Sequence, residues 1–214
     1  MEWDIKIKGC QDNGRARQIY ADLEAVQSSI LELAPNNVDS AKLKRNHIRI
    51  YPFSKSEPGN EYFIINGRKG YVCLNANILK RRYWAALQFL IHGLAHSFCY
   101  LRDEIGEEAF CEWAAYSVIK KLAEQRGEKF CRRILKSIMS LSSQDYRAFY
   151  RAAKHLEARN PGCMIKLNNR AKHRKIRKSI EKQIISRALK TKRHKKLDEL
   201  DYSIPELEKG FRKI

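Results

Sequence analysis

The sequence predicts an α+β protein with a small, mostly antiparallel sheet, followed by extra helices and a basic C-terminal tail. Three short runs rich in Ile, Val and Tyr, at residues 47–51, 62–65 and 71–74, are typical of strands. Long segments with helical apolar periodicity follow these runs without another strand-like segment between them. A group of strands followed by a group of helices indicates the α+β class rather than an alternating α/β sheet.

The N-terminal third contributes the predicted sheet and one helix. Residues 4–7 are expected to form a short strand, and residues 15–33 a helix that ends before Pro35. The runs at 62–65 and 71–74 are joined by Asn-Gly-Arg-Lys-Gly, a composition that favours a β-hairpin. The hairpin chemistry is the reason for expecting antiparallel pairing.

Four consecutive helices are predicted after the sheet, at about residues 80–100, 106–126, 128–141 and 143–159. The break Asn160-Pro161-Gly162 then interrupts the chain, because proline and glycine disfavour continuation of a helix. We therefore expect one domain at residues 1–160 and a basic helical extension at residues 161–214.

A pair of histidines stands near the end of the first of these helices. His92 and His96 are separated by four residues, so on a helix they share one face and both imidazoles can reach one metal ion. A tetrahedral zinc site that keeps one position open needs a third protein ligand. Zinc is therefore the expected cofactor if a further ligand lies close by.

Two carboxylates on the next helix have the same spacing. Glu108 and Glu112 share a helix face, so one of them can coordinate a metal ion while the other accepts the remaining N–H of a metal-bound imidazole. The residues alone do not decide which glutamate takes which role.

The order of these motifs resembles the gluzincin group of zinc metallopeptidases, especially minigluzincins and ImmA/IrrE-like proteins. The resemblance covers roughly residues 47–122 and includes the strand-like segment 70–75, which is similar to the edge strand before the metal helix in that group. It implies a zincin-like core built on a metal helix and a glutamate helix. The resemblance implies the following roles: His92 and His96 as metal ligands, Glu108 as the third ligand, Glu112 as its supporting partner and Glu107 as an alternative third ligand.

Gly93 departs from the pattern of these peptidases. The residue after the first histidine of HExxH is a glutamate that serves as general base, and a glycine cannot take up a proton. No catalytic residue is therefore assigned. Three interpretations remain, in order of preference: a pseudoenzyme that keeps the metal, a scaffold that has lost it, and an enzyme that uses Glu104 or Glu107 as its base.

The composition indicates a cytoplasmic protein. The 214 residues contain no apolar run long enough to span a membrane, and the N-terminal residues do not resemble a signal peptide. Six cysteines are scattered without a C-x-x-C pair, which disfavours a zinc ribbon and does not suggest a disulfide framework.

Most of the net charge of +19 lies near the C-terminus. Residues 166–196 hold 14 lysines and arginines and a single acid, Glu181, so this tail is expected to bind nucleic acid or a ribonucleoprotein through phosphates. The segment has no aromatic residue, so base stacking is not expected from it. The predicted contacts are Lys172, Arg174, Lys175, Arg177, Lys178, Lys192, Arg193, Lys195 and Lys196.

Two functions are consistent with these features. The first is a metallopeptidase-like protein, impaired by Gly93, that holds a peptide or protein in its cleft and binds a polyanion through its tail. The alternative is a non-enzymatic nucleic-acid- or ribosome-associated binding protein in which a degenerate zincin scaffold supports the tail.

Overall fold

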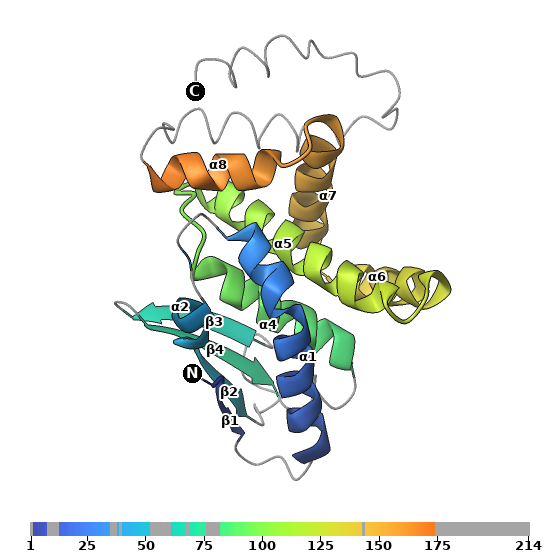
Figure 1. The fold of residues 1–214 in the computed structure, drawn as a ribbon. Coiled ribbons are helices and arrows are strands. Elements are labelled where there is room, and N and C mark those ends of the chain that lie inside the picture. The colour runs from blue at the N-terminus through green and yellow to red at the C-terminus, as the bar shows by residue number, and fades with distance from the viewer. Residues whose placement is uncertain are drawn as a thin grey trace. The chain divides into compact units, whose positions relative to one another are not determined.

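A computed structural model describes residues 2–7, 13–34, 38, 40–51, 61–66, 69–75, 82–142 and 144–173. The chain combines helices with one sheet, so the predicted α+β class is confirmed (Figure 1). Within these residues the chain divides into two compact units. The first unit holds the residues up to Phe98 together with Ala114–Ser142, and the second holds Cys99–Trp113 and residues 144–173. The domain boundary expected at residue 160 stays a prediction.

The sheet has four strands in the order β1-β2-β4-β3. Strand β1 (Asp4–Ile7) pairs in parallel with β2 (His47–Tyr51), and β2 pairs in parallel with β4 (Lys69–Asn75). Only β3 (Glu61–Asn66) is antiparallel to its neighbour, β4. The expectation of a mostly antiparallel sheet is therefore wrong.

The parallel pairing has a simple cause in the connection between β1 and β2. Helix α1 (Asn13–Leu33) and the short helix α2 (Ser40–Lys44) lie between these strands in the chain, and a helical crossover returns the chain in its original direction. Hairpin chemistry fixed only the β3–β4 turn, where the predicted antiparallel pairing is confirmed as far as Asn66 and Lys69.

Strand β4 lies inside the sheet rather than at its edge. It is flanked by β2 on one side and β3 on the other, so the expectation that residues 70–75 form the edge strand is wrong. The edge strand on that side is β3. Sequence alone could not distinguish the two, because both strands of a hairpin have similar apolar composition.

Helices α1 and α4 (Tyr83–His96) form the core of the first unit with the sheet. Ile19, Leu23 and Ile30 of α1 are buried, and so are Leu87 and Leu90 of α4. Figure 1 shows both helices on the same side of the sheet. Packing α4 against β4 places its last turn, which carries the histidine pair, next to the sheet.

Two further helices continue the chain. Helix α5 (Glu104–Glu124) contributes Glu104–Trp113 to the second unit and the rest to the first. Helix α6 (Glu128–Leu141) follows Gly127, whose φ of 99° is in the region that favours glycine. Both helices lie close to their predicted ranges.

The second unit contains α7 (Gln144–Arg159) and α8 (Cys163–Lys172). Glu157 begins α8 by accepting hydrogen bonds from the backbone N–H of Gly162, at 2.8 Å, and of Met164, at 2.7 Å. Burial, with Glu157 nearby, raises the pKa of the Cys163 thiol to about 12. Sequence patterns do not predict α8 as a separate helix, because its lysines and arginines resemble the basic segment after it.

Candidate metal site

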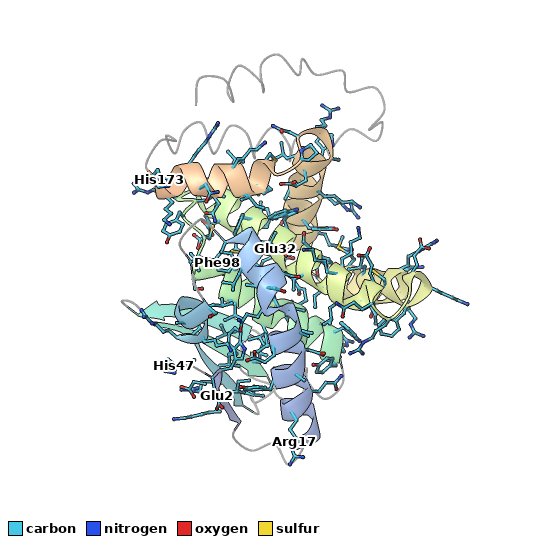
Figure 2. All side chains as sticks on the ribbon, viewed as in Figure 1. Glu2, Arg17, Glu32, His47, Phe98 and His173 are labelled. Carbon is cyan, nitrogen blue, oxygen red and sulfur yellow. The ribbon has the colours of Figure 1, made fainter. Side chains whose placement is uncertain are left out.

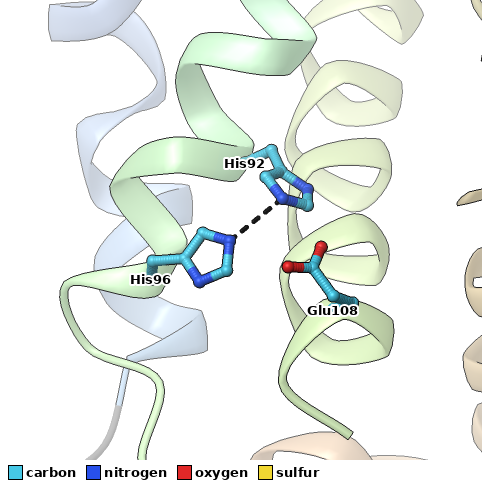
Figure 3. A group of neighbouring side chains, drawn as sticks. All are labelled: His92, His96 and Glu108. Atoms are coloured by element: carbon cyan, nitrogen blue, oxygen red, sulfur yellow. Dashed lines mark hydrogen bonds between the residues drawn. The ribbon is translucent and has the colours of Figure 1, made fainter. Parts of the chain in front are cut away.

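The last turn of α4 carries both histidines. The two Nε2 atoms lie 3.1 Å apart and the ring centroids 4.9 Å apart (Figure 3). Two imidazoles on one tetrahedral zinc ion would have their nitrogens roughly 3.3 Å apart, given Zn–N distances of about 2.0–2.1 Å. The observed separation of the ring nitrogens is thus close to the one that a shared metal ion requires.

The turn that follows the histidines is fixed to the helix. The backbone N–H of Ser97 donates to the carbonyl of Leu94 at 3.0 Å, and the Ser97 hydroxyl donates to the same carbonyl at 2.6 Å. Phe98, which comes next, is almost fully buried. These contacts fix the backbone directly after His96, which limits the positions that its imidazole can take.

Glu108 supplies a carboxylate to the same group. The potential ligand atoms of His92, His96 and Glu108 all lie within 4.8 Å of one another, and each of these residues is half-buried. Figure 3 shows the carboxylate on α5 directed toward the two rings. These three residues form a group that can hold a metal ion. Among the described residues it is the only such group of histidine, cysteine and acidic side chains.

Gly93 is buried against the sheet between the two histidines. A Cβ atom at this position would lie 2.9 Å from Cγ1 and 3.2 Å from Cγ2 of Val72 on β4. The first distance is shorter than real carbon contacts, and Val72 is 1% exposed, so its short side chain has little room to move. The glycine therefore permits the close approach of α4 to β4, a role that the sequence did not reveal.

The other predicted acids are placed on the first half of α5. Glu107 is half-buried, its backbone N–H donates to the carbonyl of Asp103 at 2.8 Å, and it does not belong to the group of potential ligands. Glu112 is one turn beyond Glu108 and is 2% exposed. Glu104 is exposed in the first turn. The supporting role of Glu112 stays a prediction.

Two cysteines near this part of the chain are poor candidates for metal ligands. Burial, followed by a hydrogen bond that the Cys111 thiol donates to Cys99, raises the pKa of Cys111 well above its usual value. Neither Cys99 nor Cys111 belongs to the group of potential ligands that the described residues form. The donor set in this region is therefore nitrogen and oxygen.

Sequence reasoning missed a buried amide that holds the segment between α4 and α5. Asn168 of α8 is fully buried, and its Oδ1 accepts a hydrogen bond from the backbone N–H of Tyr100 at 2.6 Å. Lys172, one helical turn further along, places its Nζ 5.8 Å from the centre of the Tyr100 ring. An asparagine within a basic segment gives no sequence signal for such a role.

Only one of the predicted nucleic-acid contacts lies in the described part of the chain. Lys172 belongs to the last turn of α8, and His173, labelled in Figure 2, follows it. The remaining predicted contacts lie outside the described residues: Arg174, Lys175, Arg177, Lys178, Lys192, Arg193, Lys195 and Lys196.

Comparison of the chain with protein-family models, with curated proteins and with solved structures found no match. A search of the described helices for one that is long and apolar enough to cross a bilayer also found none. The function is therefore inferred from the sequence and from the geometry of the described residues.

Proposed function

We propose that this protein is a zincin-type, metallopeptidase-like protein that binds one divalent transition-metal ion, zinc, and lacks the general base of the active peptidases. The observation that carries the proposal is the convergence of the ligand atoms of His92, His96 and Glu108 within 4.8 Å. The resemblance of the sequence to gluzincins supports the same three ligands in the same order along the chain.

The donor set favours zinc. Two neutral imidazoles and one carboxylate suit zinc better than calcium or magnesium, which prefer oxygen ligands. Three protein ligands leave a fourth position for water or for a carbonyl oxygen. Bound zinc would supply Lewis acidity there, polarising an oxygen that occupies this position.

The residues around the ligands support a site that binds without efficient hydrolysis. Position 93 carries no side chain, and Val72 occupies the space that a Cβ atom would need. Glu104 and Glu107, the two acids named as substitute bases, both lie outside the group formed by His92, His96 and Glu108, and Glu104 is exposed at the start of α5. A peptide or protein that binds at the metal site would therefore be held rather than cleaved.

Calorimetric titration of zinc into metal-stripped protein tests the proposal. The wild type is expected to bind one equivalent, and Glu108→Gln is expected to bind much more weakly because an amide oxygen is a poorer ligand than a carboxylate. Glu107→Gln, one residue earlier on the same helix, is the matched control and should bind like the wild type. Equal loss in both variants, or no binding by the wild type, would contradict the proposal.

A second candidate function is binding of a polyanion by the basic C-terminal part of the chain. Helix α8 contains Lys166, Arg170 and Lys172 and no acidic residue, so the charge excess expected for the tail begins within folded structure. Replacing Lys192, Arg193, Lys195 and Lys196 by glutamine should weaken binding to duplex and single-stranded nucleic acid alike, and reduce its salt dependence. If the variant binds nucleic acid with unchanged affinity, the tail does not contribute to polyanion binding.

A further inference from the structure

Helix α7 carries aromatic and basic side chains in two adjacent rows. An α-helix turns 3.6 residues per revolution, so Tyr146 and Tyr150 form one row and Arg147 and Arg151 form the next. Lys154 extends both rows by a further turn. The opposite face packs inward, since Ala152, Ala153 and Leu156 are buried.

Accessibility supports a surface role for this face of α7. Tyr146 is 38% exposed, and no other large hydrophobic side chain whose burial the structure describes is as open to solvent. Its ring lies edge-on against Phe149, with the centroids 6.1 Å apart and the planes at 89°. Arg151 and Lys154 are exposed as well. An aromatic ring that is partly open to solvent can stack on a planar ligand such as an unpaired base.

The cations of this face are not neutralised by the acids of α7. No ion pair within the described residues engages Arg147, Arg151 or Lys154. Both carboxylate oxygens of Glu157 accept hydrogen bonds from the backbone of α8. The surface therefore keeps a local positive charge and has side chains arranged for anionic groups.

We propose that this face, formed by Tyr146, Arg147, Tyr150, Arg151 and Lys154, binds single-stranded nucleic acid. Proteins that bind single strands combine basic side chains along the phosphates with aromatic rings on which unpaired bases stack. The basic tail has no aromatic residue and can supply only the first of these. The inference deepens the polyanion-binding candidate, but it rests on α7 and not on the tail or the metal site.

The single strand fits this face better than a membrane surface would. A membrane-bound helix needs a broad apolar face, whereas this face is basic, with Tyr146 exposed and Tyr150 half-buried. Paired bases in a duplex are already stacked and cannot use the tyrosines. Dependence on an unpaired strand is thus the property that distinguishes the proposed ligand from other polyanions.

Fluorescence anisotropy on the full chain tests the proposal with an oligouridylate about 12 nucleotides long and a duplex of equal length. Tyr146→Leu should weaken single-strand binding about 5- to 150-fold, as expected for loss of one stacked base, and leave duplex binding unchanged. Replacing Arg147, Arg151 and Lys154 by glutamine should lower the salt slope for the single strand by about 2.

The matched control removes three charges from α6 through Lys129→Gln, Arg132→Gln and Lys136→Gln, which all lie at exposed positions. This variant should bind the single strand more tightly than the α7 charge variant does. Equal loss in both charge variants, or an equal effect of Tyr146→Leu on both probes, would overturn the assignment. The variant in which glutamine replaces Lys192, Arg193, Lys195 and Lys196 separates binding by α7 from binding by the tail. The effect of Tyr146→Leu on single-strand binding should persist in that variant.

Discussion

Gly93 and Val72 face each other at the point where α4 comes closest to β4. A Cβ atom on Gly93 would lie 2.9 Å from Cγ1 of Val72, and Val72 is itself buried at 1% exposure. The missing glutamate and the close packing of the helix on the sheet are therefore connected. A side chain at position 93 requires a shift of the helix, the strand or Val72.

Gly93→Ala is expected to destabilise the protein. The overpacking cost of about 1–3 kcal/mol should exceed the roughly 1 kcal/mol gained by replacing a glycine inside a helix. Val72→Ala should relieve the contact, so the double variant should lose less stability than the sum of the two single variants. Urea unfolding of all four proteins measures this coupling.

Val26→Ala combined with Gly93→Ala is the control for the double-variant comparison of Gly93 and Val72. Val26 on α1 is also buried, at 2% exposure, and is not among the nearest atoms to position 93. The effects of Val26→Ala and Gly93→Ala should add. Additive effects for Val72 as well would contradict the proposed contact.

Gly93→Glu alone is expected to yield no metal-dependent peptidase activity. The new side chain would displace α4 from β4, and a general base must lie within hydrogen-bond reach of the activated water. Combining Gly93→Glu with Val72→Ala gives the carboxylate more room. Cleavage of a casein substrate with and without chelator provides the measurement, and full activity in the single variant would show that position 93 has space after all.

The sequence predicted elements that depend on local patterns. Strand β2 and helix α6 have the predicted bounds, and the β3–β4 hairpin follows from its turn composition. The order of strands did not follow in the same way, because β1 pairs with a strand more than forty residues away. Such pairing depends on the crossover path of the chain, which local composition does not encode.

In the candidate site, too, local patterns predicted some features, whereas contacts between distant segments were missed. Helical spacing predicted that His92 and His96 share a face, and the structure brings Glu108 to them. Helical spacing did not predict the packing of Val72 against Gly93, because that contact joins segments about twenty residues apart. Asn168 was missed for a similar reason, since its hydrogen bond joins α8 to a residue 68 positions earlier.

Asn168→Ala should loosen the segment between α4 and α5. The substitution removes the acceptor of the Tyr100 N–H, which costs about 1–3 kcal/mol when the donor cannot find another partner. Hydrogen exchange should accelerate at the Tyr100 amide in particular. Asn169→Ala, at the less buried neighbouring position, is the control, and equal exchange rates at Tyr100 in both variants would contradict the role of Asn168.

Asp4 should contribute stability that depends on pH. Hydrogen bonds from Arg49 and His47 lower the pKa of Asp4 from 3.8 to about 2 in the folded protein. The folded state thus favours the ionised carboxylate, so its stabilising effect is present above about pH 4 and is lost as the pH falls toward 2.

Thermal unfolding of Asp4→Asn across this pH range measures the effect. The variant should melt at a lower temperature than the wild type at pH 6, and the difference should shrink between pH 4 and pH 2. Asp145→Asn, on the exposed face of α7, controls for loss of a negative charge. A difference in melting temperature that stays constant with pH would contradict the assigned ion pair.

The metal content of the purified protein shows whether His92, His96 and Glu108 hold a zinc ion. Elemental mass spectrometry should find about one zinc per chain in the wild type and in His173→Ala, a control at an exposed histidine, and little in His92→Ala. Zinc bound equally by all three proteins would place the ion elsewhere. A wild type that stays free of zinc after purification with added zinc would contradict the metal site itself.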